Sequence, residues 1–364
     1  MKVLLLVKNF DLGGTEVHVR ELANGLAEAG HRVFVMSRSG RQVECLNAGV
    51  TFIQHRFTDF GLLGAVSKVR TLIRSEKIEI IHGHQRLPIL IAAIVKILTG
   101  ISSVATIHGR ISLDSRPAFM RRWIDRMIVV APNRLSNLRE RDVIRDKCCV
   151  IYNGLALEGR GPSRDKIQGF NLLYASRIDR RHGQALITLL KEVWPSLLRQ
   201  FPNAKLHIAG DGNRLTEVQE VAKPFTGPSE QSVFFHGFLP SLVPLFKETS
   251  LTLGVGRVAI ESLALGIPVI PVNSAYWAPV ISRENYKILK ADNFVGRSFY
   301  EFEPEPLLAE LQRVLGELDE IYCETQNLSE EVYQDFSLAR MVNLVEKVYQ
   351  ELADQVDQMV PRQF

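Results

Sequence analysis

The 364-residue sequence predicts an α/β protein built from two Rossmann-like, doubly wound domains. Short, continuously apolar runs alternate with longer amphipathic segments along nearly the whole chain, as expected for buried parallel strands joined by helices. The chain is too long for one ordinary core and suits two domains of ordinary size. A composition with 46% hydrophobic and 23% charged residues is that of a globular protein.

The first half of the chain carries the alternating signals of one such domain. It opens with the apolar run Val3–Val7, and the loop that follows ends in Gly13-Gly14, before an amphipathic helix that Gly30 terminates. Thr15 is the expected cap of that helix. Further apolar runs predict strands at 32–36, 50–53, 78–82, 103–107, 127–130 and 150–152. The segments between them predict helices near 62–76, 86–99, 117–127 and 132–140.

A change in composition predicts a domain boundary. Asn153-Gly154 is followed by 158–169, a stretch rich in glycine, proline and charge that is typical of a linker. Beyond it, strands are predicted at 172–176, 205–209, 233–235, 251–253 and 269–272. Helices are predicted at 183–200, from about 213, and at 241–247, 305–318 and 337–356, whereas 275–298 has no clear pattern. Domains 1–155 and 156–335 in tandem imply a ligand cleft between the carboxyl ends of their strands.

The turn Gly254-Val255-Gly256 is the strongest indication of a ligand-binding site in the sequence. It lies between a predicted strand and a predicted helix, so a ligand can approach its backbone, and the free N–H groups of the helix favour an anion there. Glu261 follows one turn further along the helix. Because like charges repel, this carboxylate is better placed to accept hydrogen bonds from sugar hydroxyls than to bind the same anion.

The cysteines and the apolar runs indicate the compartment. Cysteines 45, 148, 149 and 323 have no metal-ligand spacing, and such sparse use suits a reducing environment. The apolar run at the start is too short for a signal peptide. The longest other run, 87–98, contains Lys96 and is shorter than the ~20 residues of a spanning helix. We therefore expect a cytoplasmic protein.

Residues 110–147 carry an excess of five positive charges, ten Lys/Arg against five Asp/Glu, in a chain whose net charge is +4. Aromatic and aliphatic residues, Trp123 among them, share this stretch with its arginines. A basic and apolar face can rest on an anionic membrane surface, and a solvated helix face with core residues explains the pattern equally well. No motif for binding nucleic acid is present, so we expect no nucleic-acid partner.

Several short motifs, taken together and in order, resemble the retaining glycosyltransferases of family four, which have the GT-B fold. The matching motifs are GGTE at 13–16, TIHG at 106–109, YNG at 152–154, GDG at 210–212, the glycine turn through Glu261 to 266–270, and Asp335-Phe336-Ser337 with Tyr349. The resemblance covers essentially the whole chain. It implies that the segment 336–364 is a helix that crosses back to the first domain.

The resemblance also implies an activity. Members of this family move a sugar from a nucleotide-diphosphate donor, here expected to be a UDP-sugar, to a glycan, lipid-linked or small-molecule acceptor with retention. We therefore expect a hexosyltransferase type of enzyme in cell-surface polysaccharide or lipopolysaccharide synthesis. The donor is a substrate, so no cofactor is expected. The sequence has no Asp-x-Asp metal motif, which agrees with metal-independent transfer and predicts no metal site.

Roles follow for single residues that match the family's motifs. Catalytic roles fall to His108 beside the transferred sugar, to Arg177 at the donor diphosphate, and to His182, which replaces the family's lysine as second cation. The expected donor-binding residues are Gly13, Gly14, Arg177, His182, Gly210, Gly254, Val255, Gly256 and, at the ribose, Glu261. Fixed cations and helix N–H groups suit this chemistry because a dianionic diphosphate leaves as the sugar bond breaks.

The sequence departs from the family's pattern at three places. Leu253 stands where a glutamate usually contacts hydroxyls of the transferred sugar, Arg257 stands where an apolar residue is common, and Ser274–Trp277 replaces a glycine pair. An apolar wall at Leu253 would favour a modified sugar over plain glucose. Alternatively, Leu253 packs in the core.

Two other classes of function remain open at this point. A nucleotide-sugar epimerase can share the same two-domain architecture and bind the same ligand, although its usual acidic catalytic residues are not evident. A non-catalytic relative that binds a nucleotide or a partner is compatible with Leu253 and His182. Nucleotide release, measured with and without acceptors, separates the three.

Overall fold

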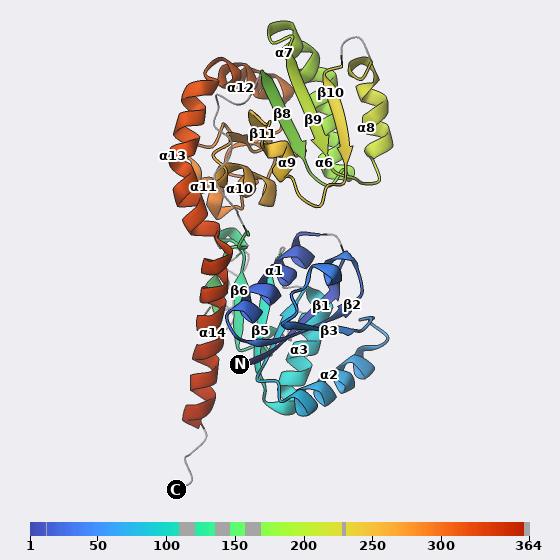
Figure 1. Ribbon diagram of the computed structural model, residues 1–364, viewed down its shortest axis with the longest axis vertical. Coiled ribbons are helices and arrows are strands. Elements are labelled where there is room, and N and C mark those ends of the chain that lie inside the picture. Colours follow the sequence, from blue (N-terminus) through green and yellow to red (C-terminus); the bar gives the residue numbers. More distant parts are fainter. Residues whose placement is uncertain (12, 109–120, 135–145, 157–168, 228–230, 360–364) are drawn as a thin grey trace. The chain divides into compact units, whose positions relative to one another are not determined.

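The computed structural model of the chain describes residues 1–359 except 12, 109–120, 135–145, 157–168 and 228–230. It contains two compact units (Figure 1). The first unit comprises Met1–Ala156 together with Asp335–Phe364, and the second comprises Leu157–Gln334. Each is built around a parallel sheet with helices, so the predicted fold class is confirmed.

The first unit contains a seven-stranded parallel sheet in the order β3-β2-β1-β4-β5-β6-β7. Its strands are β1 (Lys2–Asn9), β2 (Arg32–Arg38), β3 (Val50–Gln54), β4 (Ile80–His84), β5 (Ser102–Ile107), β6 (Arg126–Val129) and β7 (Cys148–Val150). The helices between them include α1 (Gly14–Glu28), α2 (Leu62–Glu76) and α3 (Arg86–Thr99). The strand order reverses between β1 and β4, and the carboxyl ends of strands at such a reversal are where ligands bind in doubly wound folds.

The side chains of β1 show that this sheet is buried on both faces. Leu4 and Leu6 belong to the core on one face, whereas Val3 and Leu5 belong to the core on the other, and all four are fully buried. Successive side chains of a strand point to opposite faces, so a strand covered on both sides must be apolar throughout.

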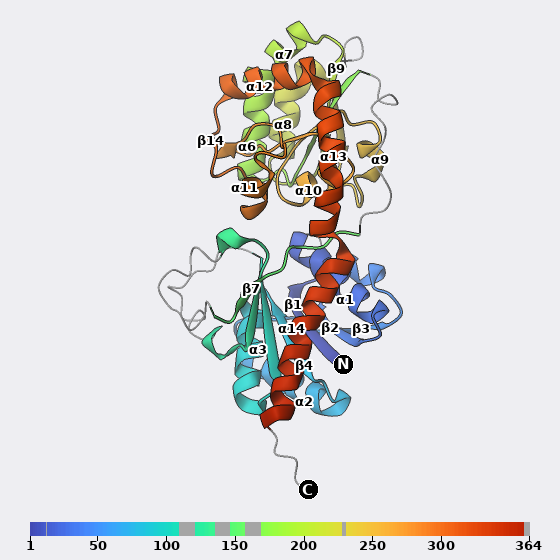
Figure 2. The same cartoon turned by 90° about the vertical axis from the view of Figure 1, so that its left-hand side faces the viewer.

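Helix α14 (Leu338–Met359) packs against α1 in the first unit (Figure 2). A Cβ placed on Gly25 of α1 would lie 2.5 Å from a methyl group of Val342, so the two helices meet where this glycine leaves room. Deeper in the interface, the hydroxyl of Tyr349 is hydrogen-bonded at 2.6 Å to Nδ1 of the buried His82. The other ring nitrogen of His82 lies 2.8 Å from Oγ1 of Thr106. The last helix is thus held by packing and by one buried polar network.

Removal of the Tyr349 hydroxyl should destabilise the first unit. Tyr349→Phe leaves Nδ1 of His82 buried without a partner, which costs about 1–3 kcal/mol of unfolding free energy. The same change at Tyr333, which is 44% exposed on α13 (Leu318–Phe336), should cost almost nothing. Urea unfolding of both variants is the measurement, and equal stabilities of the two would contradict the structural role of the network.

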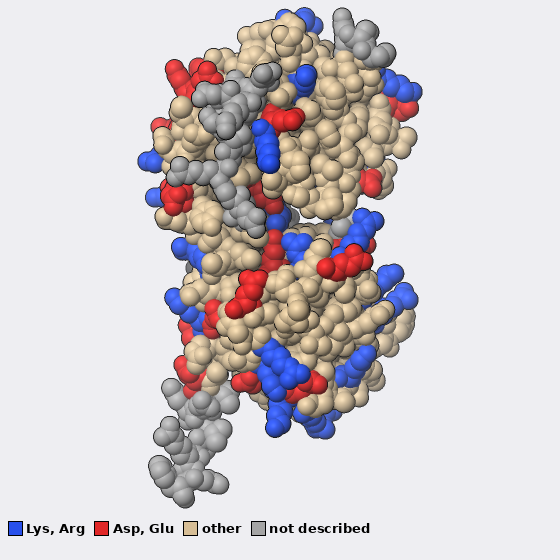
Figure 3. Space-filling view, in the orientation of Figure 1, with Lys and Arg blue, Asp and Glu red and all other residues tan. Residues whose placement is uncertain are grey.

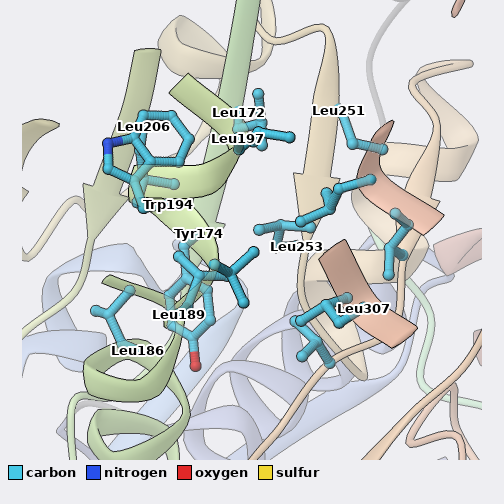
Figure 4. Close-up of a cluster of buried hydrophobic side chains, with 14 of the residues drawn as sticks. Leu172, Tyr174, Leu186, Leu189, Trp194, Leu197, Leu206, Leu251, Leu253 and Leu307 are labelled. Atoms are coloured by element: carbon cyan, nitrogen blue, oxygen red, sulfur yellow. The ribbon is translucent and has the colours of Figure 1, made fainter. Parts of the chain in front are cut away.

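The second unit contains a five-stranded parallel sheet in the order β10-β9-β8-β11-β12. The strands are β8 (Phe170–Ala175), β9 (Ala204–Ala209), β10 (Val233–Gly237), β11 (Leu251–Leu253) and β12 (Val269–Ile270). The helices include α6 (Arg180–Thr188), α7 (Trp194–Gln200), α8 (Leu215–Ala222), α9 (Val243–Phe246), α10 (Arg257–Ala264), α11 (Tyr286–Ala291), α12 (Pro304–Gly316) and α13. Apolar side chains of the sheet and of α6, α7, α8, α12 and α13 form one cluster around the fully buried Leu172 and Trp194 (Figure 4).

Three segments differ from the sequence prediction. The 19-residue helix α13 was not predicted, because many acidic residues lie between the apolar ones and obscure the helical pattern in the sequence. Its apolar face contains the buried Tyr322, Leu328 and Val332. The region 275–298 contains α11 and β13 (Tyr276–Trp277), which pairs antiparallel with β14 (Tyr300–Glu301) just beyond it. Within 117–127, the described part is a 3₁₀ turn at Arg121–Trp123 followed by β6, and most of the helix predicted at 132–140 lies outside the described residues.

None of the helices in the described part of the chain is long and apolar enough to cross a membrane. On the face shown in Figure 3, basic and acidic side chains are interspersed over both units. Much of the basic stretch 110–147 lies outside the described residues. Within its described part, Trp123 is 46% exposed and the guanidinium of Arg122 lies 5.9 Å from the centre of its ring.

Candidate active site

The second unit brings three of the predicted site segments to one edge of its sheet. Arg177 follows β8 and is exposed, Gly210 follows β9, and Gly254 follows β11. β8 lies between the other two strands, with Tyr174 aligned to Leu253 and Ala175 to Ala209. Because the three strands are parallel, the three loops emerge side by side at the carboxyl edge.

Gly210 allows the loops after β8 and β9 to touch through their backbones. It has φ = +141°, and a Cβ built on it would lie 1.9 Å from the carbonyl oxygen of Ser176. Its N–H donates to the carbonyl of Gly237 at 2.7 Å. Gly212 has a similar role, since its Cβ would lie 2.3 Å from the carbonyl oxygen of Ile178. The segment Ser176–Ile178, which carries Arg177, is therefore held by close backbone contacts with Gly210 and Gly212 in the loop after β9.

The turn Gly254-Val255-Gly256 leads directly into α10. Gly256 precedes the helix with φ = +60°, a conformation that glycine adopts without strain. Its N–H donates to the carbonyl of Asn293 at 3.1 Å, which anchors the turn to the loop after α11. The first N–H groups of α10 have no acceptor within their own helix, and they point toward the same edge as Arg177. The turn can therefore receive an anion.

Glu261 lies one helical turn into α10 and is paired with Arg257. The Nε of Arg257 is 2.7 Å from Oε1 of Glu261, and the glutamate side chain is 20% exposed. Arg257 thus neutralises Glu261 one helical turn away. A ligand hydroxyl would meet a carboxylate that the arginine already orients.

His182, at the start of α6, is hydrogen-bonded to Asp179. Asp179 caps this helix by accepting the N–H groups of Arg181 and His182, at 3.0 and 3.1 Å. The same oxygen lies 3.0 Å from Nδ1 of the His182 ring. Burial raises the pKa of Asp179, but the hydrogen bonds from His182 and Arg181 outweigh it and lower that pKa below its ordinary value. Arg180 and Arg181 are exposed beside it.

Leu253 does not form the apolar wall that its position in the motif suggested. Its side chain is 0% exposed and packs in the core with Leu251 and Leu172 (Figure 4). Strand alternation explains this, because Leu251 and Leu253 share one face of β11 while Thr252 faces the other, where its hydroxyl meets Ser262 at 2.7 Å. The expectation of a modified sugar loses its physical basis, and the alternative that Leu253 is a core residue holds.

In the first unit, His108 lies in a cluster of histidines. It directly follows β5, while His84 ends the neighbouring β4 and His18 lies on α1. Nδ1 of His84 is 3.2 Å from Nε2 of His108, and the ring of His18 is 4.7 Å from that of His108. His82 stacks on His84 with 4.3 Å between ring centres.

Burial keeps the rings of His82, His84 and His108 neutral. It lowers the pKa of His108 to about 4 and that of His82 to about 3. The pKa of His84 lies well below its ordinary value for the same reason, with further lowering by neighbouring histidines. At neutral pH His108 can therefore donate or accept a hydrogen bond, but it is not an imidazolium. Sequence reasoning missed His18 and His84, although the pattern His-Gly-His at the end of a strand was a signal.

Gly13 and Gly14 lie at the start of α1, Gly13 as the residue before the helix and Gly14 as its first residue. No side chain among the described residues caps the helix, and the expectation that Thr15 caps it is wrong, because the helix begins at Gly14, two residues before the start that a Thr15 cap requires. Gln85 supports this loop from β4's side. Its side chain accepts the N–H of Lys8 and donates to Oε1 of Glu16, both at 2.9 Å.

Gln85 makes these contacts at the cost of backbone strain. It has φ = +69° and ψ = +167°, a conformation that residues other than glycine rarely adopt. Such strain persists only where the surroundings enforce it, and it gathers at functional sites. The sequence held no sign of this residue's role.

Comparisons with known proteins decide the family. The family model described as Glycosyltransferase Family 4 matches residues 12–158, and the model described as Glycosyl transferases group 1 matches residues 169–295. The chain belongs to the family-four glycosyltransferases. The glycine turns, Arg177 and the histidines described above all lie within these two matched ranges.

Curated relatives of this family-four glycosyltransferase include two with named activities. The chain is 24% identical over 370 residues to the phosphatidylinositol N-acetylglucosaminyltransferase gpi3 subunit of Schizosaccharomyces pombe, a match that covers 94% of this chain and 78% of the relative. It is 29% identical over 244 residues to the Arabidopsis thaliana protein that is named as one subunit of the same transferase. That second match covers 60% of this chain and 54% of the relative.

Solved structures show the GT-B fold of this glycosyltransferase. A glycosyltransferase from Rickettsia africae is 18% identical with a TM-score of 0.74, over 97% of this chain and 98% of the other. Anabaena Alr3699/HepE in complex with UDP is 17% identical with a TM-score of 0.73, over 96% of this chain and 100% of the other.

Proposed function

We propose that this glycosyltransferase moves a sugar from a UDP-linked donor to a glycan or lipid-linked acceptor with retention of configuration. One observation carries the donor assignment. Arg177 and the turn Gly254–Gly256 emerge from the carboxyl ends of the neighbouring parallel strands β8 and β11. A guanidinium and the N–H groups at a helix start are the donors that a diphosphate needs, and here they share one edge.

The chemistry of the transfer fits these groups. When the bond between sugar and diphosphate breaks, negative charge develops on the leaving diphosphate, and fixed donors stabilise that charge without reorganising. Arg177 can bind two phosphate oxygens through its planar fork. In the proposed reaction the acceptor attacks the face from which the diphosphate leaves, and the diphosphate takes the acceptor's proton. Such a step needs neither a cofactor nor a metal ion at the diphosphate.

The neutral state of His108 suits a place beside the transferred sugar. A neutral imidazole can share a hydrogen bond with a sugar hydroxyl, and it adds no positive charge that would hold back the departing diphosphate. Glu261, oriented by Arg257, is the proposed acceptor of hydrogen bonds from the ribose.

The comparisons support a choice of substrates to test. Anabaena Alr3699/HepE has been solved with UDP and with UDP-glucose, and the two curated relatives are named as subunits of a phosphatidylinositol N-acetylglucosaminyltransferase. We propose UDP-N-acetylglucosamine as the first donor and a lipid-linked acceptor at the cytoplasmic face of a membrane, in cell-surface polysaccharide or lipopolysaccharide synthesis. The basic stretch 110–147 is the proposed membrane contact.

Replacement of Arg177 should weaken UDP binding. Arg177→Ala removes a charged hydrogen-bonding partner of the diphosphate, which is worth about 1.5–3 kcal/mol, or roughly 10- to 150-fold in Kd. The matched control is Arg199→Ala. Arg199 is also exposed in the second unit, but it lies at the end of α7 just before β9 and so at the amino edge of the sheet.

Calorimetric titration with UDP measures both variants. Unchanged affinity in Arg177→Ala, or equal losses in the two, would overturn the assignment. Transfer is tested separately by UDP release from UDP-N-acetylglucosamine and UDP-glucose with and without a lipid-linked acceptor. An epimerase would interconvert the free nucleotide sugar without acceptor, and a binding protein would release no UDP.

A further inference from the structure

We propose that Asp292 is a positioning residue for the donor diphosphate. Its carboxylate holds the segment 293–297 in a conformation that fixes the turn Gly254–Gly256, and with it the N–H groups that meet the phosphates. This role rests on the proposed function, because it takes the turn as the diphosphate site. Asp292 lies in the region 275–298, which has no clear pattern in the sequence, and all of these residues belong to the second unit.

The segment meets the turn at Gly256. The N–H of Gly256 donates to the carbonyl of Asn293 at 3.1 Å, and a Cβ built on Gly256 would lie 3.1 Å from Nδ2 of the same asparagine. This N–H is therefore engaged, and the donors that α10 offers an anion are those of residues 257–259. They precede the first hydrogen bond inside the helix, from Ile260 to Gly256. Their direction depends on how Asn293 holds Gly256.

The backbone of the segment is strained where it meets the turn. Asn293 has φ = +61° and Phe294 has φ = +57°. Asparagine tolerates this left-handed region, whereas a bulky residue such as phenylalanine rarely adopts it. No other two consecutive residues of the described chain have positive φ values without a glycine between or beside them. Such strain persists only where the surroundings enforce it, and it gathers at functional sites.

The carboxylate of Asp292 enforces this conformation. Its Oδ1 accepts the N–H of Val295 at 3.0 Å, and its Oδ2 accepts the N–H of Arg297 at 2.8 Å. The side chain thus closes the backbone around residues 293–296, and it is only 5% exposed. Hydrogen bonds from backbone N–H groups to a carboxylate are among the stronger ones in proteins. An alanine at this position would leave both N–H groups without this acceptor.

Neighbouring elements hold the rest of the segment. Phe294 is fully buried, its ring centre lies 5.9 Å from that of the buried Tyr286, and its N–H donates to the carbonyl of Leu289 in α11 at 2.7 Å. From the loop after β12, Nδ2 of Asn273 donates to the carbonyl of Val295 at 3.0 Å. These contacts anchor the segment on two sides, and Asp292 sets the hydrogen bonds between them.

A fixed turn matters to the proposed reaction because donors that already point at the developing charge stabilise the leaving diphosphate without reorganising. A loose turn would have to be ordered by the ligand, at the expense of affinity. Asp292 is itself an anion, so it acts through the backbone of Asn293 and Gly256 and does not contact phosphate. The effect should be confined to the phosphates, since Glu261, the proposed ribose acceptor, is oriented by Arg257.

Hydrogen exchange without any ligand tests the link between Asp292 and the turn. In Asp292→Ala, the amide of Gly256 should exchange about tenfold faster, because the carbonyl that protects it is no longer held. The matched control is Glu310→Ala. Oε1 of Glu310 accepts the N–H of Val280 at 2.8 Å, and this side chain is 11% exposed, but its hydrogen bond does not lead to the turn. Equal exchange at Gly256 in the two variants would overturn the proposal.

Titration with UDP and with uridine tests the link between the turn and the phosphates. Asp292→Ala should weaken UDP binding about tenfold and leave the affinity for uridine, which has no phosphate, unchanged. A general structural defect would weaken both ligands alike. Asp292→Asn keeps one accepting oxygen and should restore part of the UDP affinity. Glu310→Ala should bind both ligands like the wild type.

Unchanged UDP affinity in Asp292→Ala, or equal losses for UDP and uridine, would overturn the positioning role. Should Asp292→Ala fail to fold, Asp292→Asn takes its place in both measurements, with the same direction and a smaller effect. A wild type that does not bind UDP would refute the proposed function instead. In that case faster exchange at Gly256 still supports the hold of Asp292 on the turn, and unchanged exchange overturns it.

Discussion

A change from pH 7.5 to 5.5 should lower the unfolding free energy of the first unit by about 4 kcal/mol. In the folded state the pKa of His82 is lowered to about 3 and that of His108 to about 4, and the pKa of His84 lies well below the ordinary 6.5. Between these values and 6.5 the unfolded chain binds protons that the folded chain excludes. Stability is therefore complete above pH 6.5 and lost as the pH falls below it, by about 1.4 kcal/mol per histidine over this range.

Urea unfolding at the two pH values, followed by pulsed hydrogen exchange in peptides of β4, measures this loss in the first unit alone. His84→Asn should remove about a third of it, because only two of the three rings then titrate. Val69→Ala is the control: Val69 is fully buried in the same unit, so its truncation destabilises equally at both pH values. The same pH dependence in wild type and His84→Asn would contradict the effect.

Substitution of Gly210 by alanine should cost about 3 kcal/mol or more of the stability of the second unit. The residue has φ = +141°, and its new Cβ would lie 1.9 Å from the carbonyl oxygen of Ser176, so the backbone itself must move. Ser176 precedes Arg177. We therefore expect weaker UDP binding as well, even at temperatures where the variant remains folded.

Gly227→Ala is the matched control for this prediction. Gly227 lies in the same unit, and a Cβ built on it has no atom of the described residues within 4 Å. Thermal unfolding and UDP titration should separate the two variants clearly. A Gly210→Ala protein as stable as the Gly227 variant, with wild-type UDP affinity, would show that the loop after β8 adapts without loss.

Much of the fold could be predicted from the sequence because the deciding signals are local. The apolar run at the start predicted β1, and a strand buried on both faces must have that composition. The helix expected at 62–76 is α2 with the same bounds. By contrast, α13 was missed because its apolar positions are sparse among acidic residues, and its helical state depends on what packs against it.

Some residues of the candidate site could likewise be predicted from the sequence, and others could not. The glycines at 210, 254 and 256 could be found from the sequence, because a turn between strand and helix needs them wherever the backbone must bend sharply or approach another segment. Leu253 could not be assigned, since the sequence does not say which face of a short strand meets the core. His18 and His84 were missed for another reason: they reach His108 only through the order of the strands.

The sequence by itself determined the two doubly wound domains, the family resemblance, and the loops at which Arg177, Gly210 and the turn 254–256 lie. These follow from periodicity and turn chemistry, which act over a few residues. Only the tertiary structure decided that Leu253 is core, that His82 binds Tyr349 of the last helix, and that histidines from α1, from the end of β4 and from the residue after β5 converge. Contacts between residues so distant in the chain depend on strand order and packing, to which no local pattern corresponds.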